Sequence, residues 1–92
     1  MALNTGVIGL GNIGGGVAKN LAAAGHIVIG YDTDLSRIGE AGAQEAADAA
    51  EVSQRADLVV LAVPTLSAWR ASLAAITANG RRGLIVIDLC TF

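Results

Sequence analysis

Cysteine, aromatic residues and long apolar runs are scarce in this sequence. Cys90 is the only cysteine, so no internal disulfide can form, and no Cys or His stands near it at metal-ligand spacing. We therefore expect a reduced thiol and no structural metal. The net charge of -2 comes with dispersed Lys and Arg rather than a basic stripe, which argues against nucleic acid as a partner.

The longest uninterrupted apolar run, Leu58 to Val63, is far too short to span a bilayer, and the first residues show no signal-peptide pattern. These absences predict a cytoplasmic protein with no membrane partner. Aromatic residues make up only 3% of a chain that is 53% hydrophobic, so Ala, Val, Ile and Leu must build the core. Such residues suit helices packed closely on a parallel sheet, and 92 residues suffice for one small domain.

Glycine, by contrast, is abundant. The stretch Gly9-Leu10-Gly11-Asn12-Ile13-Gly14 has the GxGxxG spacing of a dinucleotide-binding turn. In that interpretation Gly9 allows the tight turn, Gly11 lets a phosphate approach the backbone, and Gly14 lets the helix lie close to the sheet. The first amides of that helix would then face an anion. In a chain with 12 glycines, the spacing alone also fits a glycine-rich surface loop.

The flanking segments favour the dinucleotide interpretation. An apolar strand, Leu3 to Ile8, is predicted before the turn, and a helix from Asn12 to about Ala24 is predicted after it. A second strand, His26 to Tyr31, ends in Asp32, which lies 18 positions after Gly14. This is close to the roughly 20 positions expected for a carboxylate that binds the adenosine ribose hydroxyls.

Strands and helices alternate along the rest of the chain. The first helix carries the apolar stripe Ile13, Val17 and Leu21, and after Asp32 a short helix is predicted that Asp34 caps and that turns Leu35 and Ile38 inward. A weak strand from Ala43 to Ala47 and a helix from Ala49 to Ala56, begun by Asp48 and Glu51, follow. The last predicted elements are a strand from Leu58 to Val63 that Pro64 stops, a helix with Trp69, Leu73 and Ile76 on one stripe, and a strand from Leu84 to Ile87. This alternation predicts an α/β, Rossmann-like, doubly wound parallel sheet of about five strands in the order 3-2-1-4-5. His26 is interpreted as a surface residue at a strand entry, not as a catalytic base.

Several stretches are characteristic in their order and spacing. They are the glycine turn, Ala18-Lys19-Asn20-Leu21, Gly25-His26, Ala56-Asp57 and Asp88-Leu89-Cys90-Thr91. In this order they resemble the N-terminal part of the 3-hydroxyisobutyrate dehydrogenase and 6-phosphogluconate dehydrogenase-like family, the β-hydroxyacid dehydrogenases. The resemblance implies an enzyme that passes hydride between a nicotinamide cofactor and a small hydroxyacid, with Pro64 and Thr91 lining the cofactor. Cys90 stands where these enzymes usually carry serine, which would weaken a hydrogen bond expected there.

The resemblance also bears on the choice of cofactor. Members that take the phosphorylated cofactor carry Asn-Arg-Thr after the second strand, whereas this chain has Asp32-Thr33-Asp34. Two carboxylates beside the ribose would repel a 2'-phosphate, which favours NAD over NADP. Arg37 stands where some phosphate-binding members place a basic residue and keeps the choice open. The predicted cofactor contacts are Gly9, Gly11, Asn12, Ile13, Gly14, Asp32, Thr33, Val63, Pro64 and Thr91.

Enzymes of this family are much longer and carry a substrate glycine motif and a catalytic lysine beyond position 92. The only lysine here, Lys19, matches no catalytic block. We therefore expect residues 1–92 to form a dinucleotide-binding domain that is incomplete at its C-terminus, lacks a substrate domain and has no catalytic residue. Such a domain would be inactive by itself.

Two other functions stay open at this point. One is a non-catalytic module for another adenine ligand, such as FAD or S-adenosylmethionine. The other is a structural fragment that self-associates as a homo-oligomer, because the strand from Leu84 to Ile87 is predicted to be an unpaired apolar edge.

Overall fold

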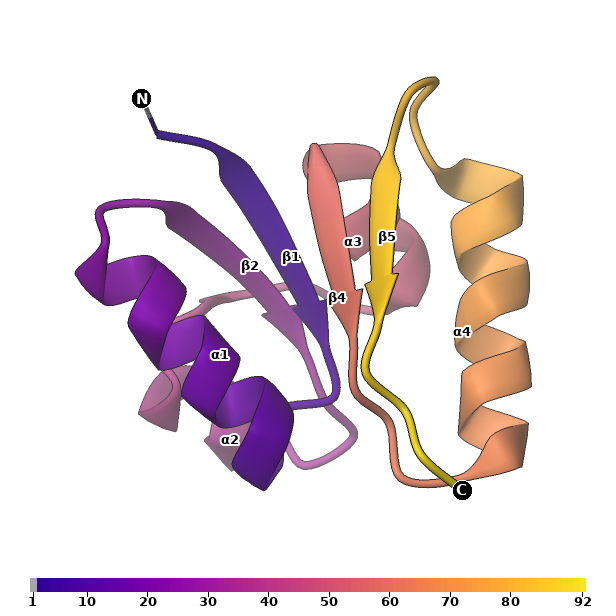
Figure 1. Cartoon of the computed structure of the whole chain (residues 1–92), viewed down its shortest axis with the longest axis horizontal. Coiled ribbons are helices and arrows are strands. Elements are labelled where there is room, and N and C mark those ends of the chain that lie inside the picture. Colours follow the sequence, from indigo (N-terminus) through magenta and orange to yellow (C-terminus); the bar gives the residue numbers. More distant parts are fainter. Residues whose placement is uncertain (1) are drawn as a thin grey trace.

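One sheet of five parallel strands organises the computed structural model, which describes residues 2–92 (Figure 1). The strands are β1 (Asn4–Ile8), β2 (Ile27–Tyr31), β3 (Gln44–Glu45), β4 (Leu58–Leu61) and β5 (Ile85–Asp88). Their order in the sheet is β3-β2-β1-β4-β5, and every pair is parallel. The predicted α/β class and strand order are therefore confirmed.

Helices cover both faces of the sheet. They are α1 (Asn12–Ala23), α2 (Ser36–Glu40), α3 (Ala49–Arg55) and α4 (Leu66–Asn79). α1 and α2 lie on one face, and α3 and α4 on the other (Figure 1). Consecutive strand residues point to opposite faces, so Val7 packs into the core under α1 and α2 while Ile8 packs into the core under α3 and α4. Consecutive apolar residues in a strand, such as Val7 and Ile8, are therefore both buried, one in each core.

The strand register brings four strand ends into one row. Ile8 pairs with Tyr31 of β2 and with Leu61 of β4, and Leu61 in turn pairs with Asp88 of β5. Because the strands are parallel, the loops that follow these four residues all emerge at the same edge of the sheet. Ligands of doubly wound sheets bind at this edge, beside the point where the strand order reverses.

The glycine turn has the geometry that its spacing predicts. Gly9 has a φ of +91°, a conformation that other residues rarely adopt. A Cβ on Gly14 would lie 1.7 Å from the carbonyl oxygen of Gly9. Only glycine at position 14 therefore lets α1 begin so close to the end of β1.

The predicted inward face of α1 is wrong at its first residue. Ile13 is 61% exposed, and the buried positions of the helix are Gly14, Gly15 and Ala18. Val17 and Leu21 are half-buried at the border of the core, as a helix stripe predicts. The close approach at Gly14 turns the small residues toward the sheet, and Ile13, one position earlier, points to solvent.

Leu35 was also expected inside and is 60% exposed, because α2 begins only after it. Ile38 is buried as predicted. Asp34 does bond to the start of this helix: its Oδ1 accepts hydrogen bonds from the Ser36 amide at 3.1 Å and from the Ser36 hydroxyl at 2.7 Å. The start of α3 is confirmed as well, since Asp48 accepts from the Glu51 amide at 2.8 Å.

All five strands differ in extent from the prediction, and β1 and β2 each start one residue later than expected. β3 contains only Gln44 and Glu45, in line with the poor strand propensity of the segment from Ala43 to Ala47. β4 ends at Leu61, because Ala62 leaves the sheet to approach the glycine turn. β5 starts one residue late, since the Leu84 amide closes a turn onto the Arg81 carbonyl at 3.0 Å.

Two glycine substitutions on α1 test this packing. Gly16→Ala adds a Cβ that meets nothing within 4 Å, so the variant should be more stable by about 0.5–1 kcal/mol. Gly14→Ala drives a Cβ into backbone and should cost about 3 kcal/mol or more. Urea unfolding followed by circular dichroism measures both, and equal effects of the two variants would contradict the close contact at Gly14.

Candidate functional site

The N-terminus of α1 opens onto the edge where the strand ends meet. The first helical hydrogen bond joins the Gly15 amide to the Gly11 carbonyl at 2.7 Å, so the amides of residues 12–14 have no partner within the helix. Gly11 is the N-cap residue, no side chain caps the helix, and its first turn carries no acidic residue. These amides and the helix dipole together favour an anion at this end.

Gly11 itself is not required by the packing. Its φ is -71°, and a Cβ built there would meet only the end of the Arg37 side chain, at 3.7 Å. A glycine in open space leaves the backbone accessible from outside. Gly14 serves the fold, whereas Gly11 keeps the turn open to a ligand.

Asp32 lies directly after β2 and is bonded to the glycine turn. Only 8% of its surface is exposed. Its Oδ2 accepts a hydrogen bond from the Leu10 amide at 2.7 Å, and its Oδ1 accepts from the Asp34 amide at 2.8 Å. The carboxylate predicted to bind ribose hydroxyls therefore also holds the glycine turn in place. Each carboxylate oxygen can accept a further hydrogen bond.

Most of the predicted contacts line one cavity of about 260 Å³ at this edge. Its walls include Gly9, Gly11, Asn12, Ile13, Asp32, Val63, Pro64 and Thr91. The exposed Ile13 thus lines this cavity from the first turn of α1. Of the other two predicted residues, Thr33 lines a neighbouring cavity, and Gly14 packs against the backbone of Gly9.

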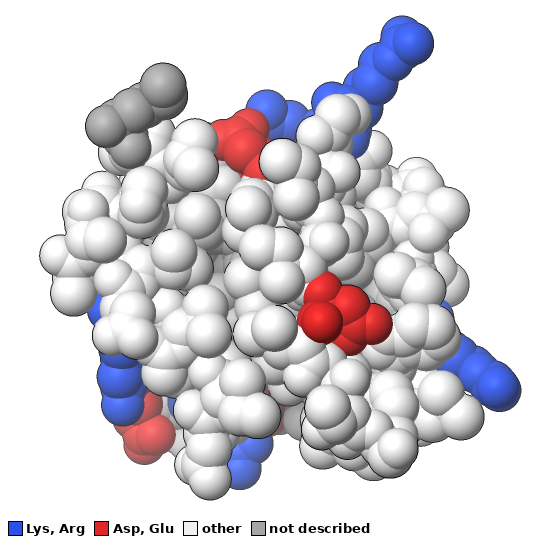
Figure 2. Space-filling view, in the orientation of Figure 1, with Lys and Arg blue, Asp and Glu red and all other residues white. Residues whose placement is uncertain are grey.

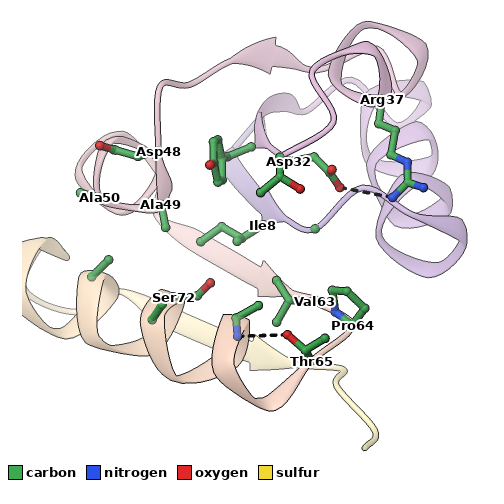
Figure 3. Close-up of a pocket in the computed structure, with 16 residues that line it drawn as sticks. Ile8, Asp32, Arg37, Asp48, Ala49, Ala50, Val63, Pro64, Thr65 and Ser72 are labelled. Carbon is green, nitrogen blue, oxygen red and sulfur yellow. Dashed lines mark hydrogen bonds and ion pairs between the residues drawn. The ribbon is translucent and has the colours of Figure 1, made fainter.

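The neighbouring cavity is larger, about 510 Å³, and lies between α3 and α4 (Figure 3). Gly9, Asp32, Arg37, Val63 and Pro64 line both cavities, so the two adjoin at the centre of the edge. Together they form an elongated site with the carboxylate of Asp32 at its middle.

The sequence analysis missed the α4 wall of the larger cavity. This wall consists of Ala68, Ala71, Ser72 and Ala75. Their spacing of three and four residues marks one face of a helix, and their small side chains leave room beside it. This spacing of small residues is present in the sequence. The prediction considered only the apolar stripe of Trp69, Leu73 and Ile76 on the same helix.

Charges at the middle of the site are dominated by carboxylates. The half-exposed guanidinium of Arg37 lies 3.9 Å from Asp32 Oδ2 and 3.6 Å from Asp34 Oδ2 (Figure 3 shows the first pair). Hydrogen bonds from Ser36, with a smaller effect of Arg37, lower the pKa of Asp34. One cation thus faces two carboxylates.

Asp88 fixes the loop at the far end of the site. Its Oδ2 accepts a hydrogen bond from Trp69 Nε1 at 2.8 Å, and its Oδ1 accepts from the Cys90 amide at 2.9 Å. The Leu89 amide donates to the Leu61 carbonyl at 2.9 Å. These bonds tie the loop that carries Thr91 to α4 and β4. The bond from the Cys90 amide, followed by the bond from Trp69, lowers the pKa of Asp88.

Cys90 lines the smaller cavity through this loop. Its thiol lies 3.5 Å from the Leu61 carbonyl, in position for a weak S–H donor. Burial raises the pKa of the thiol, which therefore stays protonated at neutral pH.

Two ionisable side chains outside the predicted contacts do not line either cavity of this site. Lys19 is exposed and lines a third cavity, of about 370 Å³ between α1 and α2, which shares Gly11, Asn12 and Arg37 with the smaller cavity. His26 stands before β2, at the opposite edge of the sheet, and its Nδ1 accepts a hydrogen bond from the Leu3 amide at 3.1 Å.

Among residues 2–92, no group of three or more His, Cys, Asp and Glu side chains could hold a metal ion. Each helix within the described chain is too short or too polar to cross a bilayer.

Comparison with known proteins places this site in context. A family model described as the NAD binding domain of 6-phosphogluconate dehydrogenase matches residues 4–92. The mitochondrial 3-hydroxyisobutyrate dehydrogenase of Mus musculus is 38% identical over 94 residues, a match that covers 94% of this chain and 28% of the relative. The probable 3-hydroxyisobutyrate dehydrogenase of Mycobacterium tuberculosis H37Rv is 33% identical over 87 residues, or 91% of this chain and 30% of the relative.

Solved structures agree with these matches. The chain superposes on Mycobacterium tuberculosis 3-hydroxyisobutyrate dehydrogenase, solved with L-serine, with a TM-score of 0.87 and 30% identity. That match covers 96% of this chain and 31% of the solved chain. The imine reductase of Myxococcus stipitatus, a variant solved with NAD+, shares the fold with a TM-score of 0.84 at 21% identity, over 100% of this chain and 32% of the solved one. The chain spans less than a third of the length of these relatives.

Asp88 predicts a stability change in acid. Its pKa in the folded chain lies below the ordinary value of 3.8, so its hydrogen bonds stabilise the fold above that pH. This stabilisation is lost as the pH falls through the lowered folded-state pKa. Asp88→Asn should therefore lower the free energy of unfolding at pH 6, and its difference from the wild type should shrink below pH 3.8.

Urea unfolding followed by the fluorescence of Trp69, the single tryptophan, measures this difference at each pH. Glu40→Gln, which removes an exposed carboxylate on α2, is the matched control and should show no such trend. A difference between Asp88→Asn and the wild type that stays constant down to pH 2 would contradict the role of this carboxylate.

Proposed function

The chain belongs to the family of the NAD binding domain of 6-phosphogluconate dehydrogenase, and from this premise we propose that it is the cofactor-binding portion of a hydroxyacid oxidoreductase resembling 3-hydroxyisobutyrate dehydrogenase. NAD is the cofactor of the proposed site. The observation that carries the proposal is the glycine turn: the buried carboxylate of Asp32 holds its Leu10 amide, and the first amides of α1 stay open.

The residues of the site fit a dinucleotide along its length. The amides of residues 12–14 receive the diphosphate, because Gly11 leaves them open. The larger cavity receives the adenosine half beside Asp32 and Thr33. The smaller cavity receives the nicotinamide half, bounded by Pro64 and Thr91. When bound, the cofactor would supply the hydride acceptor, while these residues bind and orient it.

The charges beside the ribose support NAD over NADP. Asp32 and Asp34 both lie within 4 Å of Arg37, which is the cation nearest to them. A 2'-phosphate would meet two carboxylates and would have to draw Arg37 away from both. NADP should therefore bind more weakly than NAD.

We propose binding without turnover for the chain by itself. Its matches cover less than a third of the length of the 3-hydroxyisobutyrate dehydrogenases to which it is similar. In this proposal residues 1–92 supply the dinucleotide-binding part, and the substrate-binding and catalytic residues are not among them. The free thiol of Cys90 also suits a reducing compartment, so the proposal includes a cytoplasmic location.

Gly11→Val tests the proposed diphosphate site. A side chain at position 11 covers the open turn without a clash in the fold, so NAD and ADP-ribose should bind at least about ten-fold more weakly at nearly unchanged melting temperature. Gly16→Val, on the same helix in open space, is the matched control and should bind NAD like the wild type. Isothermal titration calorimetry gives the affinities.

Equal affinity of Gly11→Val and the wild type would refute the diphosphate site. A thermal-shift comparison with FAD and S-adenosylmethionine tests the alternative adenine ligands, because the ligand that binds the folded chain raises its melting temperature by mass action. A larger rise with either of these than with NAD would favour the alternative binding module.

A second candidate function, self-association, is favoured by β5. This strand is at the end of the sheet, so one of its edges has no neighbouring strand in the described chain. Ile85 is 58% exposed, and Val86, Ile87, Leu89 and Phe92 are exposed as well. The face of the molecule over β4 and β5 carries few charged side chains (Figure 2). An apolar, unpaired edge strand invites pairing with a second copy.

Ile85→Lys tests this candidate. A charge on the edge strand should shift the chain from dimer to monomer in analytical ultracentrifugation. Leu35→Lys, which places the same charge at an exposed leucine beside α2, should leave the oligomeric state unchanged. A wild-type chain that stays monomeric at high concentration would exclude self-association through β5.

A further inference from the structure

One hydroxyl in the larger cavity has no hydrogen-bond partner within residues 2–92. Ser72 lies in the middle of α4 and is 8% exposed, so it is among the buried polar side chains of the protein. Its side chain lines the cavity and projects from α4 toward the space beside Ile8 (Figure 3). No fully buried side-chain oxygen or nitrogen among residues 2–92 lacks a partner, so the Ser72 oxygen is open to the cavity, where water or a ligand can bond to it.

Other polar side chains on these helices satisfy themselves locally. The Ser53 hydroxyl donates to the Ala49 carbonyl at 2.7 Å, and the Thr77 hydroxyl donates to the Leu73 carbonyl at 2.8 Å. Both use the carbonyl four residues earlier, which is the usual partner of a helical hydroxyl. Ser72 is directed into the cavity instead, so its hydroxyl is available to a ligand there.

The surroundings of Ser72 restrict what that ligand can be. Ala68, Ala71 and Ala75 form the rest of the α4 wall, and Ile8 and Val63 face it. This apolar part of the cavity suits an aromatic ring. The charged side chains of the cavity, Asp32, Arg37 and Asp48, come from other elements. The hydroxyl on the α4 wall can meet a polar edge of the ring as donor or as acceptor.

We propose that Ser72 is a specificity-determining residue for the base of the bound nucleotide, and that its hydroxyl bonds to a polar edge atom of adenine. The inference rests on the proposed function and adds to it the residue that recognises the base. An apolar ring without such an edge would leave the hydroxyl unpaired, which is how a buried polar group discriminates between ligands of similar shape.

Ser72→Ala tests the assignment, with adenosine monophosphate, NAD and ribose 5-phosphate as ligands. Adenosine monophosphate and NAD should each bind about three- to ten-fold more weakly to the variant, the effect of one lost hydrogen bond. Ribose 5-phosphate, which shares the sugar phosphate but has no base, should bind equally to both chains. NMR titration measures all three affinities, including weak ones.

Thr77→Val is the matched control, since it removes a hydroxyl from the same helix outside the cavity and should leave all affinities unchanged. Alanine is the best helix former, so Ser72→Ala should keep α4 intact.

Equal binding of adenosine monophosphate to wild type and Ser72→Ala would overturn the inference while the NAD site stands. Equal weakening of ribose 5-phosphate would overturn it too, because the hydroxyl would then act on the sugar phosphate or through the fold. A wild-type chain that binds neither NAD nor adenosine monophosphate would instead refute the proposed function.

Discussion

The hydrogen bond from the Leu10 amide to the carboxylate of Asp32 is the interaction on which the site depends. It joins the end of β2 to the turn between β1 and α1 and is largely hidden from water, where a charge-assisted bond is strong. Asp32 thereby fixes the position of the first amides of α1. The same carboxylate lies where the two cavities adjoin, so one residue both holds the glycine turn and lines both cavities.

The sheet register and a set of small residues provide the remainder of the site. Since Ile8, Tyr31, Leu61 and Asp88 end their strands in one row, the loops that follow them converge without long connections. Gly14 lets α1 lie against β1, and the alanine-rich face of α4 leaves the larger cavity open. The small residues at these positions therefore shape the site as much as the larger side chains that line it.

Features that depend on neighbouring residues in the sequence were predicted correctly. Features that depend on how the helices and strands pack together were missed. The turn at Gly9, the capping by Asp48 and the alternation of strands and helices follow from neighbouring residues, so they were predictable. The outward direction of Ile13 depends on how closely α1 meets the sheet, which periodicity does not contain. The bond of Asp32 to Leu10 depends on the register between β1 and β2, and the α4 wall has no hydrophobic signal to mark it.

The central claim is that the backbone amides at the start of α1 bind the diphosphate of NAD. Amide chemical shifts of the ¹⁵N-labelled chain during an NAD titration test it most directly. The account predicts that the largest saturable shifts fall on the amides of Leu10 and of residues 11–14, with smaller ones at Thr33 and Thr91. Saturable NAD binding that leaves the amides of residues 11–14 unshifted would contradict it.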